Sequence, residues 1–240
     1  MSRNLRQLIC IDLDGPILDV SERYYRVYSD TLNSIGLDPL AKEPYWRLKR
    51  NKVSEPEILA ESGTVSADLI AEYLKTRDER IESAEYLIFD QTWPNISETL
   101  KTLRSRGALA LVTMRKFKKL LDQQLNSLKL LDSFDSVLTA GPDEVANERG
   151  ERKAQLVRGC YGNQEISGWF VGDTETDIQS GRLLGLRTAA ITFGIRNVEH
   201  LKAISPDVML HSTVEFQNWA NLTLPALGTV RDIGQVRESE

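Results

Sequence analysis

The chain has 240 residues, of which 41% are hydrophobic and 27% charged, and its formal net charge is −5. This is enough for one sizeable domain, or a domain with an insertion, and an acidic chain is poorly suited to nucleic acid or an anionic membrane as its main partner. The two cysteines have no metal-site spacing, the N-terminal apolar run is too short for a signal peptide, and no stretch approaches a membrane span. We therefore expect a cytoplasmic protein.

The first apolar run, residues 8–12, predicts a buried strand that ends in acidic side chains. The stretch LICIDLDGPILD brings Asp12 and Asp14 to the end of this strand, followed by Gly15 and Pro16. Removing even one carboxylate from water is costly. The pair is therefore either solvated at the strand end or placed beside a positive group.

The next segment, residues 20–91, contains no convincing buried strand. Ser54 and Glu57 have the spacing of a capping box, which predicts a helix start. We interpret the whole segment as an all-helical cap inserted between the first and second strands of a sheet. Its helical patterns cover residues 21–34, 44–49, 57–62 and 68–87.

From residue 92 onward, short apolar runs alternate with longer amphipathic ones. Strands are predicted at 108–113, 136–140, 168–173, 188–192 and 207–210, and helices at 96–106, 116–131, 151–161 and 177–184. Such alternation is typical of an α/β fold with a doubly wound parallel sheet of Rossmann type, covered on both faces. We expect the core to comprise residues 1–19 and 92–230, the cap 20–91, and a flexible tail 231–240.

Reactive side chains follow several of the predicted strands. Thr113 and Asp173 end two of them, Asp177 lies one helical turn later, and Lys153 lies near the start of a helix. In open α/β sheets, ligands bind beyond the carboxyl ends of the strands. Together with Asp12, this set offers oxygen ligands for Mg²⁺, a nucleophile, a hydroxyl donor and a cation, which suits it to hold a phosphoryl group.

Four segments in this order, DLDGPILD, LVTMR, Lys153 and GDTETD, resemble the four motifs of the haloacid dehalogenase-like superfamily of phosphohydrolases. They are most similar to the phosphoglycolate phosphatase and β-phosphoglucomutase branch, which has a helical cap. The resemblance implies a Mg²⁺-dependent phosphatase that acts on a small phosphorylated metabolite.

The resemblance assigns the acidic residues to two roles. Asp12 corresponds to the nucleophile that forms an aspartyl phosphate, and Asp14 to the general acid/base, which also offers its backbone carbonyl to the metal. Asp173 corresponds to a further metal ligand. Asp177 corresponds to a carboxylate that supports the metal site directly or through water.

The remaining predicted site residues would bind the substrate. Thr113 and Lys153 correspond to the phosphate-binding hydroxyl and cation of the family. Met114 and Arg115 stand where a small polar residue is usual, and Arg115 would add a cation near the phosphate. Arg50, in the cap, is a hypothetical contact to the leaving group.

Two departures from the family pattern leave alternatives open. Pro16 removes a backbone donor from the first motif, which we expect the turn to tolerate. The third motif reads RKAQ, so Arg152 competes with Lys153 for the cationic role. A phosphomutase, or a non-catalytic protein that binds a phosphorylated ligand on this fold, are the alternative functions, and the sequence does not indicate the substrate or the oligomeric state.

Overall fold

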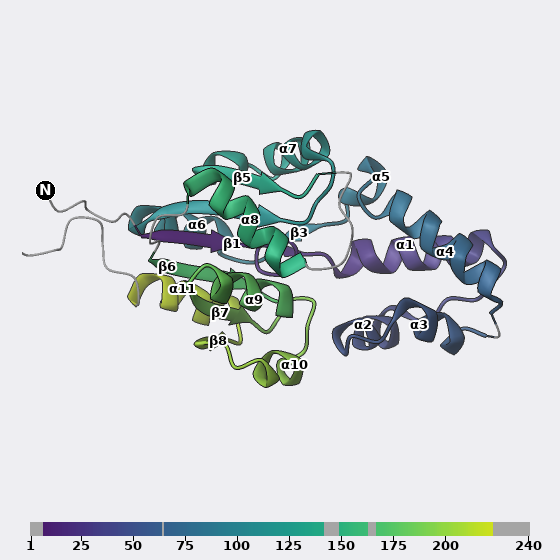
Figure 1. Ribbon diagram of the computed structural model, residues 1–240. Helices are drawn as coiled ribbons and strands as arrows, with labels where there is room; N and C mark the ends of the chain where they lie inside the picture. The colour runs from purple at the N-terminus through teal and green to yellow at the C-terminus, as the bar shows by residue number, and fades with distance from the viewer. Residues whose placement is uncertain (1–6, 64, 142–148, 163–166, 223–240) are drawn as a thin grey trace, which may run out of the picture.

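The computed structural model describes residues 7–63, 65–141, 149–162 and 167–222. Within them, six strands form one parallel sheet in the order β5-β4-β1-β6-β7-β8 (Figure 1). The chain moves outward from β1 to β5 and then continues from β6 on the other side of β1, so the predicted doubly wound α/β fold is confirmed. The strands are β1 Leu8–Ile11, β4 Ala108–Thr113, β5 Ser136–Thr139, β6 Gly168–Gly172, β7 Arg187–Ile191 and β8 Val208–Leu210.

Helices cover both faces of the sheet. Ile9 and Ile11 of β1 pack with α6 (Ile96–Arg106), α7 (Lys118–Ser127) and α11 (Thr213–Leu222), whereas Leu8 and Cys10 face α8 (Arg149–Tyr161). Successive strand side chains point to opposite faces, so a strand buried on both must be apolar throughout. This explains the unbroken apolar runs of the sequence. Two further helices, α9 (Glu175–Leu183) and α10 (Val198–Ala203), pack against Ala190 of β7.

A helical region, defined here as residues 21–87, lies between β1 and β4 in the chain and beyond the carboxyl ends of the strands in space (Figure 1). It has a core of its own, in which the rings of Tyr28 and Tyr45 stack 4.3 Å apart. An antiparallel pair of short strands, β2 (Leu18–Asp19) and β3 (Gln91–Thr92), connects it to the sheet. Its helices are α1 Ser21–Ser34, α2 Lys42–Arg50, α3 Glu55–Glu61, α4 Ala67–Arg80 and α5 Ala84–Leu87.

Several boundaries differ from the sequence prediction. The helix predicted at 68–87 is two helices, since α4 ends before Ile81, whose carbonyl accepts a hydrogen bond from the Arg23 guanidinium. The helix predicted at 116–131 ends at Ser127, because Lys129 adopts a positive φ of 58° that no helix continues through, and the short turn η1 (Leu131–Ser133) follows. The capping box of Ser54 and Glu57 is confirmed at the start of α3.

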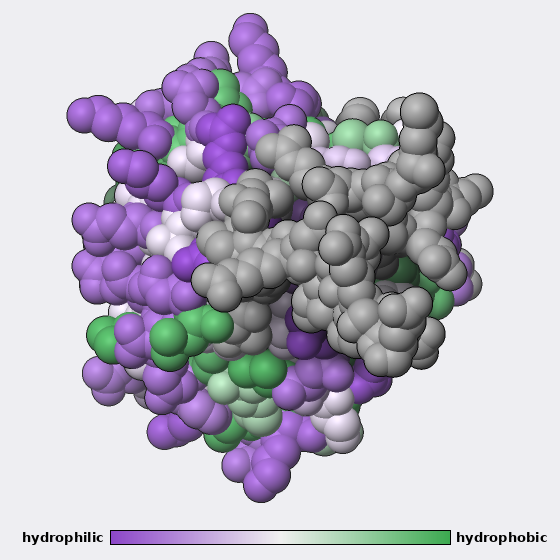
Figure 2. Space-filling view, turned by 90° about the vertical axis from the view of Figure 1, so that its left-hand side faces the viewer, coloured by the Kyte–Doolittle hydropathy of each residue, from purple (hydrophilic) through white to green (hydrophobic). Residues whose placement is uncertain are grey.

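The division into residues 1–19 and 92–230 on one side and 20–91 on the other stays a prediction. The tail predicted at 231–240 lies outside the described residues. In the described part of the chain, no helix is both long and apolar enough to cross a membrane. On the face of the core opposite the helical region, the described residues that are visible are largely hydrophilic, with smaller hydrophobic areas between them (Figure 2).

Candidate active site

The turn after β1 places the first two aspartates. The Asp12 amide donates a hydrogen bond to the Val171 carbonyl on β6, and Gly15, with a φ of +105°, donates to the Leu18 carbonyl. The Trp93 indole donates to the Gly15 carbonyl at 2.6 Å, which fixes the turn from the return connection. Pro16 is buried inside this turn. The prediction that the turn tolerates it is consistent with these hydrogen bonds, none of which needs an amide at this position.

Three carboxylates and one ammonium group meet at the end of β1 and β6. Asp12, Asp173 and Asp177 each offer one oxygen, and these oxygens all lie within 4.8 Å of one another. The Lys153 ammonium, itself 2% exposed, lies 2.9 Å from Asp12 Oδ1 and 2.6 Å from Asp177 Oδ1. Residues far apart in the sequence therefore converge at this point.

Asp177 organises the loop after β6. Its Oδ2 atom accepts hydrogen bonds from the backbone amides of Asp173 and Thr174 and from the Thr174 hydroxyl, at 3.2, 3.0 and 2.7 Å. Thr174 and Asp177 form a capping box at the start of α9. Both Asp177 oxygens are thus occupied, one by this cap and one by Lys153.

The electrostatics of this group favour a bound cation. Burial raises the pKa of Asp12 to about 7 despite the neighbouring Lys153, and burial with the charge of Asp177 raises the pKa of Asp173 well above its usual range. If all three carboxyls are ionised, they face a single ammonium and leave a surplus of two negative charges, and the raised pKa values reflect the cost of that surplus. Asp173 Oδ1 is buried and has no hydrogen-bond partner among the described residues. A divalent cation would neutralise the surplus and satisfy this oxygen.

Two glycines make room for the Asp173 carboxylate. A Cβ atom at Gly194 would lie 2.2 Å from Asp173 Oδ2, and one at Gly15 only 1.9 Å from it. The same oxygen accepts a hydrogen bond from the Ile195 amide, so the carboxylate is held against the two glycines. A methyl group at position 194 would have to displace it.

We therefore expect Gly194→Ala to weaken binding of a divalent cation by about 10- to 100-fold, because it moves a ligand carboxylate. The measurement is a titration of thermal unfolding with Mg²⁺. Gly159→Ala on α8 is the matched control, since nothing lies within 4 Å of a Cβ there. Equal Mg²⁺ dependence of the two variants would contradict this placement of Asp173.

The second aspartate of the turn belongs to a different cluster of buried charges. Asp14 accepts hydrogen bonds from Arg115 Nη2 at 2.7 Å and Nε at 3.1 Å, and from Arg23 Nη2 at 2.7 Å. Both guanidinium groups also contact Asp90, Arg23 through Nε at 2.9 Å and Arg115 through Nη2 at 3.1 Å. Gln124 on α7 donates to Asp90 at 2.8 Å. We call Asp14, Arg23, Asp90 and Arg115 the arginine–aspartate cluster.

This cluster keeps Asp14 ionised. Burial raises the pKa of its carboxyl, but Arg115 and Arg23 together outweigh that effect and hold the pKa far below its usual range. Burial raises the pKa of Asp90, which Arg23 counteracts only in part. Ionised Asp14 carries no proton, and its two arginine partners make the carboxylate a weak base.

Sequence reasoning missed Arg23 and Asp90. Arg23 lies on the same face of α1 as the buried residues Val27 and Thr31, so an arginine in that position of the helical repeat was a usable signal. Asp90 ends the apolar run YLIFD, as Asp12 ends its own. An ionisable residue at a position where the pattern demands burial points to a buried partner.

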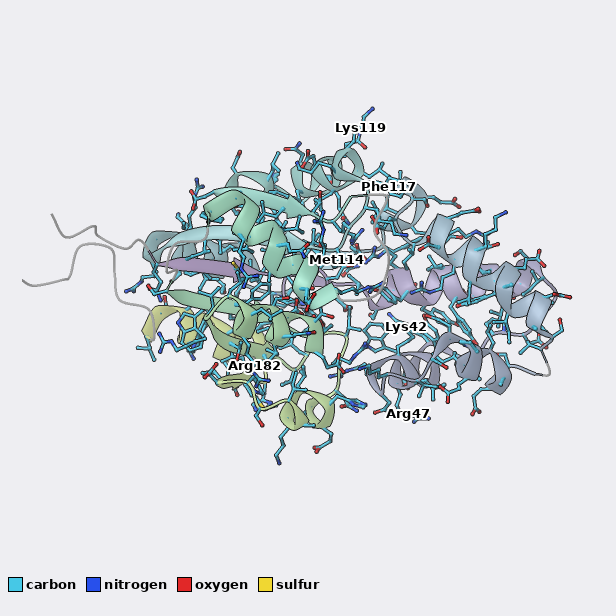
Figure 3. All side chains as sticks on the ribbon, in the orientation of Figure 1. Lys42, Arg47, Met114, Phe117, Lys119 and Arg182 are labelled. Carbon is cyan, nitrogen blue, oxygen red and sulfur yellow. The ribbon has the colours of Figure 1, made fainter. Side chains whose placement is uncertain are left out.

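One cavity of about 420 Å³ lies between the core and the helical region. Met114 lies at the edge of the sheet that faces the helical region (Figure 3). Thr113 is only 2% exposed, and its hydroxyl accepts the Arg115 amide hydrogen bond at 3.3 Å. The cavity is lined by six of the predicted residues, namely Asp12, Asp14, Thr113, Met114, Arg115 and Lys153.

Arg152 and Arg50 occupy other positions. Arg152 donates to the Ala140 carbonyl at 3.3 Å, so Lys153 is the cation that contacts Asp12. The Arg50 guanidinium donates to the carbonyls of Thr192 and Arg196 at 2.5 and 3.2 Å. Arg50 thus joins the helical region to the core and is not among the residues that line this cavity.

Comparisons with known proteins agree with this geometry. The family model described as haloacid dehalogenase-like hydrolase matches residues 7–185. The chain is 27% identical over 195 residues to phosphoglycolate phosphatase of Aquifex aeolicus, covering 78% of this chain and 85% of that one. It is 27% identical over 215 residues to pyrophosphatase PpaX of Bacillus pumilus, covering 88% and 94%.

Solved structures share the fold. A haloacid dehalogenase-like hydrolase of Streptococcus pneumoniae superimposes with a TM-score of 0.69 at 21% identity, over 89% of this chain and 98% of that one. A putative phosphatase of Clostridium difficile does so with a TM-score of 0.72 at 16% identity, over 90% and 98%.

The fold, the acidic site and the match over most of the chain define the class: the chain belongs to the haloacid dehalogenase-like hydrolases. Within that family it is a phosphatase, a phosphoric monoester hydrolase, which confirms the predicted enzyme class.

Proposed function

We propose that the protein is a Mg²⁺-dependent phosphatase that hydrolyses a small phosphate monoester through an aspartyl phosphate on Asp12. The observation that carries this proposal is the meeting of Asp12, Asp173 and Lys153 beneath a cavity that Asp14 also lines. Relatives named phosphoglycolate phosphatase and pyrophosphatase PpaX support a small substrate. A cavity of about 420 Å³ suits a ligand of that size.

The metal would be held by the carboxylates of Asp12 and Asp173 and the backbone carbonyl of Asp14, with Asp177 supporting the loop. Only oxygen donors are offered, which is the set that Mg²⁺ prefers. Bound Mg²⁺ would screen the negative charges of nucleophile and phosphate from one another.

In the first step, an Asp12 oxygen attacks phosphorus while the bond from phosphorus to the leaving oxygen breaks. Lys153 and the Thr113 hydroxyl would stabilise the charge on the transferring phosphoryl oxygens. Asp14 gives its proton to the leaving oxygen, which requires that it first release an arginine and bind a proton.

In the second step, water attacks the phosphorus of the aspartyl phosphate, and the bond from phosphorus to the Asp12 oxygen breaks. Asp14 accepts the proton of that water. Asp14 is ionised and can take up that proton, but Arg23 and Arg115 weaken it as a base, so this step too requires that it release an arginine. The helical region, acting as a cap, would exclude bulk water from the cavity during phosphoryl transfer.

We expect EDTA to abolish phosphate release and excess Mg²⁺ to restore it. Mg²⁺ at 100 times its dissociation constant should stabilise the folded protein by about 2.7 kcal/mol. Phosphate release from phosphorylated sugars, short acids and nucleotides, measured with and without chelator beside thermal unfolding, tests both statements. A chelated enzyme with full activity would contradict the proposal, and transfer of phosphate within the substrate without net release would identify a phosphomutase instead.

A further inference from the structure

The cavity has charged groups that the proposed chemistry does not use. The Lys116 ammonium, on the core, lies 2.8 Å from Asp78 of the helical region. The Lys116 backbone amide donates a hydrogen bond to Glu82 at 2.8 Å. These groups all line the cavity together with Arg149, so two carboxylates and two cations leave this part of the cavity without net charge. Arg77 and Arg196 also line the cavity, and each of them shares a single carboxylate with a second cation.

Arg77 shares its carboxylate partner with a second cation. Arg77 Nε lies 3.0 Å from Glu55 Oε1, and the Lys49 ammonium lies 2.6 Å from the same oxygen. The Tyr73 hydroxyl donates to the other oxygen at 3.1 Å. Burial raises the pKa of Glu55, but Lys49 and Arg77 together hold it below its usual range, so the carboxyl is ionised. Two cations and one anion leave this group with a net positive charge.

Arg196 repeats this arrangement from the core side. Arg196 Nε lies 3.1 Å from Glu175 Oε2, and the Lys52 ammonium lies 3.2 Å from Glu175 Oε1. Arg196 also donates to the Lys49 carbonyl at 3.4 Å, so the two groups are neighbours. Each group carries one surplus positive charge, and each presents an arginine to the cavity.

The positive and negative charges of the other groups in the site are equal in number when Arg77 and Arg196 with their partners are left out. Two arginines match two carboxylates in the arginine–aspartate cluster. Asp12, Asp173 and Asp177 would be matched by Lys153 and one divalent cation. The surplus at Arg77 and Arg196 is therefore available to a negative charge that arrives with the substrate.

We propose that Arg77 and Arg196 bind an anionic group on the leaving part of the substrate, so that the enzyme prefers phosphate esters whose leaving group carries a carboxylate or a second phosphate. This inference rests on the proposed phosphatase function. It assigns the choice of substrate to one residue of the helical region and one of the core, which line the same cavity between the two parts.

The test compares two esters of similar size, 2-phosphoglycolate and 2-hydroxyethyl phosphate, of which only the first has an anionic leaving group. Arg77→Gln should lower kcat/KM for 2-phosphoglycolate by about 10- to 100-fold, mainly through KM, because a charged hydrogen bond is lost. It should change kcat/KM for 2-hydroxyethyl phosphate by less than about threefold, since that ester makes no such contact. Arg196→Gln should act in the same direction, and Arg77→Lys should retain part of the preference.

Arg80→Gln, on the same helix, is the matched control, because Arg80 bonds to Thr31 instead. An equal loss for both esters would show that Arg77 serves the phosphoryl group or the fold, and unchanged values for both would show that no anion binds there. Either result overturns the inference while the phosphatase activity stands. Absence of phosphate release from both esters and from p-nitrophenyl phosphate in the parent enzyme would overturn the proposed function, and the inference with it.

Discussion

Asp12→Asn is expected to lower kcat by on the order of 10⁴-fold or more, because an amide oxygen cannot replace the carboxylate nucleophile. The variant should also fail to accumulate phosphate on the protein. Acid quenching during turnover, followed by mass measurement of the peptide that contains Asp12, checks the covalent step directly.

The variant should remain folded. Asp12 is buried close to other carboxylates, and its pKa is raised to about 7, so its replacement by an amide relieves the repulsion between these negative charges. Lys153 keeps Asp177 as an ion-pair partner. Asp122→Asn, at an exposed pair with Lys118, is the control and should retain full activity. Asp14→Asn should form the aspartyl phosphate and hydrolyse it slowly, so phosphate should accumulate on the protein. Substantial activity in Asp12→Asn would contradict a covalent intermediate on this residue.

Asp90→Ala is expected to lower the free energy of unfolding by about 3 to 5 kcal/mol, because it leaves two buried guanidinium groups with one carboxylate between them. Arg23 and Arg115 are 1% and 4% exposed, so water cannot readily replace the lost partner. Urea unfolding measured in the absence of Mg²⁺ separates this effect from metal binding.

Asp78→Ala is the matched control for this prediction. Its pair with Lys116 is exposed, with 61% of the Asp78 side chain accessible, and should contribute at most about 1 kcal/mol. Equal losses in the two variants would mean that the buried cluster contributes no more than a surface pair does.

The sheet and the acidic site were predictable because both follow from local patterns. A strand buried on both faces must be apolar, so a carboxylate immediately after it marks the strand end, as at Asp12 and Asp173. Parallel strands bring such ends together at one edge.

The contacts between the helical region and the core were not predictable in the same way. Arg50 was expected at the substrate and instead binds two backbone carbonyls of the core. Which surface of the core a helix of the helical region contacts depends on the orientation of the whole region relative to the sheet. No periodicity in the sequence encodes that orientation. The position of Arg23 on the buried face of its helix and of Asp90 at the end of an apolar run were the available signals.

The short ribbon of β2 and β3 has an evolutionary consequence. Leu18 pairs with Thr92 and Asp19 with Gln91, so the two chain crossings into the insertion lie side by side. A segment entered and left through adjacent strands can be exchanged as a unit without disturbing the topology of the sheet. Arg23 lies inside that unit and Arg115 outside it, so a transplanted insertion would need its own cation for Asp14 to reproduce the arginine–aspartate cluster.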